Sequence, residues 1–357
     1  MVGAAIVIAS MVVGIGAWLV YRRYRGQSTA GVPVAARAQQ KAQKAPGSAA
    51  IPAPVSDGAR IELANSLMAE RLWRLAFAAT SHAQFLEPAH IQLRDSVSAV
   101  LSADIPDPKY FPRRPTLMPQ LLQAMSDPHA ATEKLSRIVA HDPVLASDVL
   151  RLANSALYRT SPAPIETIQR AIVVLGVDAL RGLVATAMLQ PVFRATRTNF
   201  PRFPRMLWER TERAARAAEM YSLKTHPHDR FESQLVVLLS ALGPLVVYGA
   251  ALDAYSRRPD IAPSPTLCVA LITALGPQVS LRMARYWETS PRLMAAMERA
   301  PGESLAITLC AGELLGTLSL LETQNVISRD EALATARDAG LADAMVTPIW
   351  TQLTTSQ

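Results

Sequence analysis

The chain has 357 residues, of which 50% are apolar and 18% are charged, and its formal net charge is +7. This length is enough for one large domain, or two smaller ones, with a buried core. Cys268 and Cys310 are the only cysteines, too few for a disulfide framework or a cysteine-rich zinc site. The composition therefore predicts a globular protein of a reducing compartment.

The excess positive charge belongs to the first 56 residues. They contain six Arg and Lys residues and no Asp or Glu, which leaves a net charge of +1 for residues 57–357. A domain that binds nucleic acid usually carries a basic face. The nearly neutral remainder of the chain disfavours nucleic acid as a partner.

Residues 2–20, "VGAAIVIASMVVGIGAWLV", form an uncharged apolar run that is followed by "YRRYR". A helix of about 20 apolar residues spans the hydrocarbon core of a bilayer, so we expect residues 1–21 to be a transmembrane anchor. A cleaved signal peptide is the alternative, but no basic residue precedes the run. Because the arginines follow the span, the positive-inside rule predicts a single-pass inner-membrane protein with its soluble part in the cytoplasm.

The basic segment 22–57 is rich in Ala, Pro, Gly and Ser and shows no hydrophobic periodicity. It predicts a flexible linker. A helical segment is expected at 58–105, where leucines 63, 67, 72 and 75 and Ala79 would share one apolar stripe. Five prolines in residues 105–119 then indicate an extended connector.

The rest of the chain has a period near 3.6 residues and few strand signals, and predicts an all-α helical bundle. The expected helices are 119–126, 131–141, 143–157, 165–175, 179–193, 204–223, 231–241, 265–275, 279–288, 291–299, 303–321 and 329–339. The similar stretches "LLSALGPLV" (238–246) and "LITALGPQV" (271–279) are each expected to be a helix that ends at Gly-Pro.

His141 and Asp142 form a His-Asp doublet, a pair that binds metal in many phosphohydrolases. Asp142 directly precedes Pro143 and an apolar helical pattern, so it is expected to cap that helix, with Pro143 at the first helical position. A metal would compete for the capping carboxylate, and the capping interpretation is therefore favoured over a metal site.

Three stretches, "RRPTLMPQLLQAMSDP", "LSRIVAHDPVLASDVLRLANSALY" and "PIETIQRAIVVLGVDALRGLV", resemble the HDOD domain (HD-related output domain) of bacterial signalling proteins. The resemblance implies an all-α relative of the HD phosphohydrolases that generally lacks their metal ligands. It predicts an HDOD-like domain at 106–300, preceded by the helical segment 58–105 and followed by a C-terminal helical extension, 301–357.

The resemblance also locates the positions at which HD enzymes bind metal. Ser240 and Ala241 stand where the His-Asp doublet is expected, Arg210 stands about where a further His is often found, and "MERA" (297–300) contains no histidine. These side chains do not form a first-row metal site. The sequence therefore predicts no catalytic, cofactor-binding or metal-binding residues and no cofactor.

Other candidate sites are weaker. His226, His228 and Asp229 could bind zinc, but a solvated loop between helices is favoured; His82, His90 and His129 are isolated.

Cys310 lies on an apolar face and is expected in the core rather than as a nucleophile. Asn154 and Ser155 either close a helix by hydrogen bonds or line a ligand pocket, and the first is favoured. The mixed Glu and Arg residues of 208–219 are expected on a solvated helix face without a site.

These observations favour a membrane-tethered, non-catalytic signalling scaffold that acts through protein–protein contacts with partners in a bacterial pathway. Two alternatives remain: a metal-dependent HD-type phosphohydrolase acting on nucleotides or cyclic dinucleotides, and a sensor that holds a small nucleotide between helices. The absence of other catalytic motifs in the sequence is consistent with the first hypothesis.

Overall fold

The computed structural model describes residues 57–79, 87–103, 109–111, 143–159, 163–193 and 199–354, with a few isolated positions between 115 and 139. The predicted transmembrane anchor and linker, the helices expected at 119–126 and 131–141 and the cap at Asp142 lie outside these residues or mostly so. Residues 54–357 form one compact unit. Its described part is helical and contains no strand, which confirms the predicted fold class for this part of the chain.

In chain order the helices are α2 (Asp57–Phe77), α3 (Pro88–Ser102), α6 (Pro143–Ala153), α7 (Ile168–Leu175), α8 (Val177–Leu189), η1 (Gln190–Phe193), α9 (Arg202–Thr225), η2 (Pro227–Asp229), α10 (Arg230–Ser240), α11 (Leu242–Ser256), α12 (Pro265–Tyr286), α13 (Pro291–Met297), α14 (Ser304–Thr323), α15 (Arg329–Asp338) and α16 (Asp343–Thr354). From α6 onward, most consecutive helices are joined by short connections.

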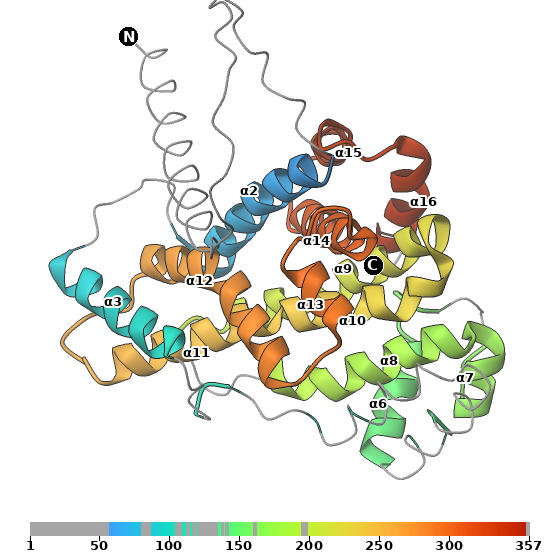
Figure 1. Ribbon diagram of the computed structural model, residues 1–357, viewed down its shortest axis with the longest axis horizontal. Coiled ribbons are helices and arrows are strands. Elements are labelled where there is room, and N and C mark those ends of the chain that lie inside the picture. The colour runs from blue at the N-terminus through green and yellow to red at the C-terminus, as the bar shows by residue number, and fades with distance from the viewer. Residues whose placement is uncertain are drawn as a thin grey trace, which may run out of the picture. The chain divides into compact units, whose positions relative to one another are not determined.

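Helices α9 and α14 form the most extensive helix pair of the described bundle (Figure 1). Helix α10 packs between α9 and α8, while α6 and α7 pack on α8. Helix α11 pairs with α12 and contacts α3, and α2 lies across α14 and α12. The N-terminal α2 and the C-terminal α14 to α16, which flank the family-like segment in the sequence, thus belong to the same bundle.

Helix α2 is attached through aromatic residues and through only part of the predicted leucine stripe. Leu72 of the stripe is buried, and Leu75 and Ala79 pack against the core, as predicted. Phe77 stacks on Phe203 with ring centroids 4.6 Å apart, and Trp73 meets the edge of Phe203 at 5.5 Å. Leu63 and Leu67 are 63% and 54% exposed, so the predicted stripe is wrong there. The error arises because α2 turns its Trp, Phe and small residues, and not its first two leucines, towards the bundle.

Neither Gly-Pro pair ends a helix, contrary to the prediction. Gly243 and Pro244 fall in the first turn of α11. The backbone N–H that proline lacks is not needed for helical hydrogen bonding in a first turn. Pro277 lies inside the single helix α12, which replaces the two expected helices at 265–275 and 279–288. Gly243 contacts α12 so closely that an added Cβ would lie 2.0 Å from the carbonyl oxygen of Gly276. These glycines allow α11 and α12 to approach each other.

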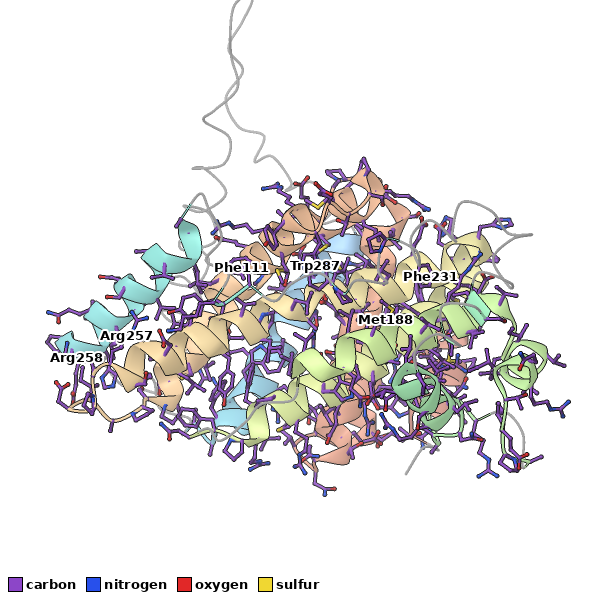
Figure 2. All side chains as sticks on the ribbon, turned by 90° about the horizontal axis from the view of Figure 1, so that it is seen from below. Phe111, Met188, Phe231, Arg257, Arg258 and Trp287 are labelled. Atoms are coloured by element: carbon purple, nitrogen blue, oxygen red, sulfur yellow. The ribbon has the colours of Figure 1, made fainter. Side chains whose placement is uncertain are left out.

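Three described helical stretches are long and apolar enough to cross a membrane on length and composition: Pro227–Ser256, Pro265–Tyr286 and Ser304–Thr323. The most apolar windows of these stretches are 72%, 56% and 89% buried within the protein. Packing inside the bundle accounts for much of their apolar character. Figure 2 shows the same division, with Phe231 and Trp287 among the packed helices and Arg257 and Arg258 at the end of α11.

Candidate functional site

The end of α6 is held by hydrogen bonds, as the sequence predicted for Asn154 and Ser155. The Asn154 amide donates to the carbonyl oxygen of Ile165 at 2.7 Å and accepts from the Ile165 N–H at 2.7 Å. The Ser155 hydroxyl donates to the carbonyl of Leu152 at 2.7 Å. The Asn154 side chain therefore satisfies the backbone N–H and carbonyl groups of Ile165 in the loop before α7, and both Asn154 and Ser155 have structural roles.

Helix α9 is a central helix of the bundle, so the prediction of a solvated face for residues 208–219 is wrong. Arg210, Arg216 and Glu219 are all buried. Arg216 donates to the Glu219 carboxylate at 2.6 Å, and Arg230 of α10 pairs with the same carboxylate. The charged residues of α9 mark buried ion pairs that connect neighbouring helices.

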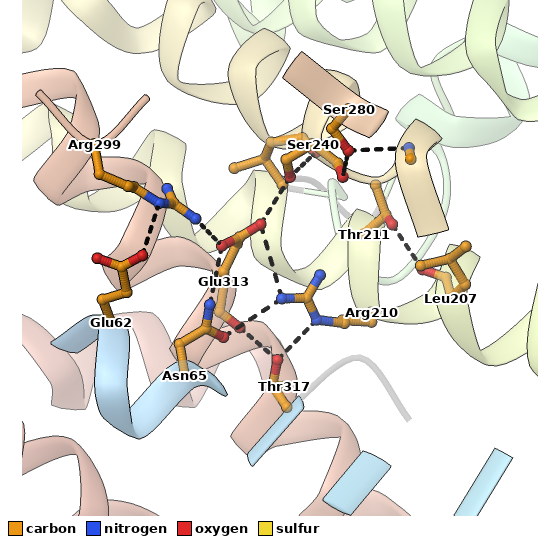
Figure 3. A network of polar contacts seen from close by, with 12 residues as sticks. Glu62, Asn65, Leu207, Arg210, Thr211, Ser240, Ser280, Arg299, Glu313 and Thr317 are labelled. Carbon is orange, nitrogen blue, oxygen red and sulfur yellow. Dashed lines mark hydrogen bonds and ion pairs between the residues drawn. The ribbon is translucent and has the colours of Figure 1, made fainter. Parts of the chain in front are cut away.

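Glu313 of α14 is the centre of a buried polar network (Figure 3). Its carboxylate accepts hydrogen bonds from the Asn65 amide at 3.0 Å, the Ser240 hydroxyl at 2.7 Å and the Arg299 guanidinium at 2.8 Å. Arg210 approaches the same carboxylate at 3.9 Å. Five helices or helix ends, from α2 to α14, therefore contribute to one ionic site.

Further hydrogen bonds fix Arg210 and Ser240 of this network. Arg210 Nε donates to the Thr317 hydroxyl at 2.8 Å, and its guanidinium lies over the Trp73 ring at 5.5 Å. The Ser280 hydroxyl donates to the carbonyl of Ser240 at 2.6 Å and accepts from the Gly243 N–H. The network is thus preorganised by helices α9, α11, α12 and α14.

Electrostatics keep this carboxylate ionised despite its burial. Burial alone would raise the pKa of Glu313, but the positive charges of Arg299 and Arg210 outweigh it and the pKa is lowered. Burial lowers the pKa of Arg210, because desolvation disfavours its charged form. Arg299 has a raised pKa, since the Glu313 and Glu62 carboxylates overcome its own desolvation.

The network forms one wall of a cavity of about 170 Å³ between α2, α12 and α14. Arg210, Arg299, Ser240 and Ser280 supply polar groups to it, and Asn65 closes it from α2. The positions at which the family resemblance placed the metal ligands, namely 210, 240 and 297–300, therefore do converge. They meet around a buried glutamate that the sequence analysis had not singled out.

The residues present do not fit a divalent metal. Guanidinium groups carry only donors, and two of them project into this site with a single buried carboxylate that they already neutralise. Among the described residues, no three His, Cys, Asp or Glu side chains form a group that could hold a metal ion. Arg210, Arg299 and Ser240 give the centre the chemistry of an anion site and not of a cation site.

The other candidate residues lie apart from this centre. His226 and His228 are exposed around η2, whereas Asp229 is buried and accepts two hydrogen bonds from Arg292, at 2.8 and 2.6 Å. Cys310 is buried in the core as predicted, and burial raises its thiol pKa to about 12. His90 lies 3.2 Å from the carbonyl of Ala262. His82, His129 and His141 lie outside the described residues.

The described part of the chain is an all-helical, HD-like bundle, in which Arg210, Ser240 and Arg299 of the ionic network stand where the family resemblance places the metal ligands. A family-wide comparison agrees, because the HDOD domain matches residues 111–302, more than half of the chain. The chain belongs to the HDOD domain family. A comparison with curated proteins gave no match.

Two solved structures are similar to this chain. A "putative metal-dependent phosphohydrolase" from Shewanella amazonensis SB2B is 16% identical, with a TM-score of 0.54, over 76% of this chain and 100% of that chain. An HDOD domain protein of unknown function from Geobacter sulfurreducens is also 16% identical, with a TM-score of 0.49, over 74% of this chain and 97% of that one. At this identity, the first similarity establishes the shared fold alone.

Glu212 of α9 provides a test of how burial affects a carboxyl group in this helix. Desolvation raises its pKa from 4.5 to about 7, so the folded protein favours the protonated form. Stability from this group is fully present below pH 4.5 and is lost as the pH rises towards 7. We expect Glu212→Gln to be more stable than the native chain at pH 8 and to lose that advantage by pH 4.5, in denaturant unfolding at both pH values.

Glu209→Gln is the matched control, because it removes the same charge one turn earlier from a side chain that is 35% exposed. An equal gain from both variants at pH 8 would show that net charge, and not burial of Glu212, is responsible. A gain for Glu212→Gln that persists unchanged at pH 4.5 would also contradict the prediction.

Proposed function

We propose that this HDOD protein is a non-catalytic regulatory module that acts through contacts with protein partners in a signalling pathway. The observation that supports it is the ionic network in which Arg210, Ser240 and Arg299, at positions where the family resemblance places the metal ligands of HD enzymes, surround the Glu313 carboxylate. Two guanidinium groups compensated by one carboxylate repel a divalent cation and leave no ligand set for it.

Exposed apolar residues give the proposal a physical basis on the protein surface. Val144 of α6 and Val173 of α7 are 71% and 75% exposed, and the two helices contact each other on one side of the bundle. A protein partner that covers both side chains would gain free energy by removing their apolar surface from water. The proposal also includes a membrane tether formed by residues 1–21, which rests on the sequence alone because these residues lie outside the described part.

A metal-dependent phosphohydrolase is the second candidate, favoured by the shared fold and by the name of the similar Shewanella protein. Metal analysis of the purified full-length chain, combined with hydrolysis assays on phosphomonoesters and phosphodiesters with added Mn²⁺, separates the two. We expect far less than one equivalent of Fe, Mn or Zn per chain and no turnover above the rate without protein. Stoichiometric metal together with turnover would establish the enzyme and overturn the regulatory proposal.

A further inference from the structure

The cavity beside Glu313 combines a cationic wall with an apolar one. Arg210 and Arg299 form the cationic wall, and Arg210 is only 4% exposed. The apolar wall consists mainly of Trp73, Ile272, Met297, Leu309, Pro244 and Pro277. A ligand that fits both walls is amphipathic, with a polar end and a small apolar body.

The charges of the Arg210–Glu313–Arg299 network do not cancel. Arg210 is buried and Arg299 is 24% exposed, and together they contribute two positive charges against the one negative charge of the buried Glu313. Glu70 also lines the cavity, but its carboxylate is paired with Arg74 at 2.7 Å. Glu62, 3.7 Å from Arg299, has a side chain that is 48% exposed, so water screens its compensation. An anion at the cavity would therefore complete the neutralisation of the two arginines.

A hydrogen-bond donor remains available in the guanidinium group of Arg299. Among the described residues, Nη1 of Arg299 is buried without a hydrogen-bond partner. Arg210 uses Nε for Thr317 and Nη2 for Asn65 and Glu313. A buried donor without a partner costs free energy, and a bound oxyanion would satisfy it with a charge-assisted hydrogen bond.

The size of the cavity limits the body of the ligand. At about 170 Å³ it is comparable to an engineered apolar cavity of about 150 Å³ that binds benzene. The Trp73 ring already stacks with the Arg210 guanidinium, so it offers an aromatic surface beside the cation. A single ring or a short aliphatic chain fits, whereas a dinucleotide exceeds this volume.

We propose that this cavity binds a small amphipathic anion, through a carboxylate or phosphate group on Arg210 and Arg299 and an apolar body against Trp73. The inference rests on the proposed non-catalytic use of the site, since the anion would bias the packing of α2 on the bundle rather than be converted. The oxyanion can be a carboxylate or a phosphate monoester, and the two are separate arms of the test.

Isothermal titration of the purified full-length chain with benzoate and with phenyl phosphate tests the proposal. Benzamide, a neutral isostere of benzoate, is the ligand control. We expect at least one of the two anions to bind saturably with a stoichiometry of one, and benzamide to bind at least tenfold more weakly. Arg210→Gln and Arg299→Gln are each expected to weaken the anion by about tenfold or more.

A third variant separates binding from folding. Glu62→Gln removes the half-exposed carboxylate that competes for Arg299, so anion affinity should increase about two- to fivefold. Glu298→Gln is its matched control, because it removes the same charge from an exposed pair with Arg285 that does not line the cavity. It should leave the affinity unchanged.

The outcomes distinguish the two proposals. Failure of both anions to bind, or equal binding of benzamide, would overturn the ligand inference while leaving the regulatory proposal intact. Hydrolysis of phenyl phosphate with stoichiometric metal would overturn the regulatory proposal itself. Binding that responds equally to Glu62→Gln and Glu298→Gln would place the anion elsewhere on the protein.

Discussion

Replacing Glu313 by alanine is expected to lower the free energy of unfolding by about 3–5 kcal/mol, among the largest effects of a single substitution in this chain. The change removes the acceptor for Asn65, Ser240 and Arg299. It leaves the buried Arg210 without a counter-charge and leaves Arg299 only the half-exposed Glu62, at 3.7 Å. Chemical denaturation monitored by circular dichroism measures this loss.

Two comparisons show whether the loss comes from the buried network. Glu331→Gln removes a carboxylate from a pair with Arg71 in which both side chains are about half exposed, and should change stability by less than about 0.5 kcal/mol. Replacing the whole triad, with Arg210→Met, Glu313→Leu and Arg299→Met, should restore stability to near the native value or above it, because no buried charge is left unpaired.

If the triple variant were as unstable as Glu313→Ala, the network would contribute more than the cost of desolvating its own charges. A loss below about 1 kcal/mol for Glu313→Ala would show that water reaches the two arginines. Either result would require a different account of the site. The triple variant also removes the proposed anion site, so it should fold without binding benzoate or phenyl phosphate.

Part of the helical pattern could be predicted from the sequence because apolar residues recur with a period near 3.6 along α6, α7, α9 and α10. Helices α11 and α16 were missed. Helix α11 is apolar on all sides and gives no periodic signal. The Gly-Pro pairs led to wrong predictions of helix boundaries, because proline is also tolerated in the first turn of a helix, as in α11. Inside α12, close packing of neighbouring helices stabilises the helix around its proline.

The site could be located but not assembled from the sequence. Family resemblance indicated Arg210 and Ser240, whereas their partner Glu313 comes from a helix 70 or more residues later. One signal for Glu313 was present: it is the only charged residue between Ser304 and Leu321, and an isolated acid in an apolar helix needs a buried partner. The Glu and Arg residues of α9 were wrongly predicted to lie on a solvated face, because surface and buried ion pairs share the same three- and four-residue spacing.

Close approach of α9 and α14 depends on two glycines of α14. Gly312 and Gly316 lie one turn apart and face Ala214 and Ala218 of α9. An added Cβ at Gly312 would lie 2.6 Å from the Ala218 Cβ. At Gly316 it would lie 2.5 Å from the Ala214 nitrogen and 2.6 Å from the Ala214 Cα, so the backbone of α9 itself would have to move. This contact also sets the distance between Arg210 and Glu313.

We expect Gly316→Ala to destabilise the protein by about 2–3 kcal/mol, because overpacking against backbone exceeds the gain of up to about 1 kcal/mol in helix propensity. Gly249→Ala is the matched control: its added Cβ meets nothing within 4 Å, so the same substitution in α11 should stabilise by about 0.5–1 kcal/mol. Opposite signs in denaturant unfolding are the expected result. If both substitutions stabilise the chain, α9 and α14 are not in the close contact that brings Arg210 to Glu313, and the anion cavity has no fixed wall.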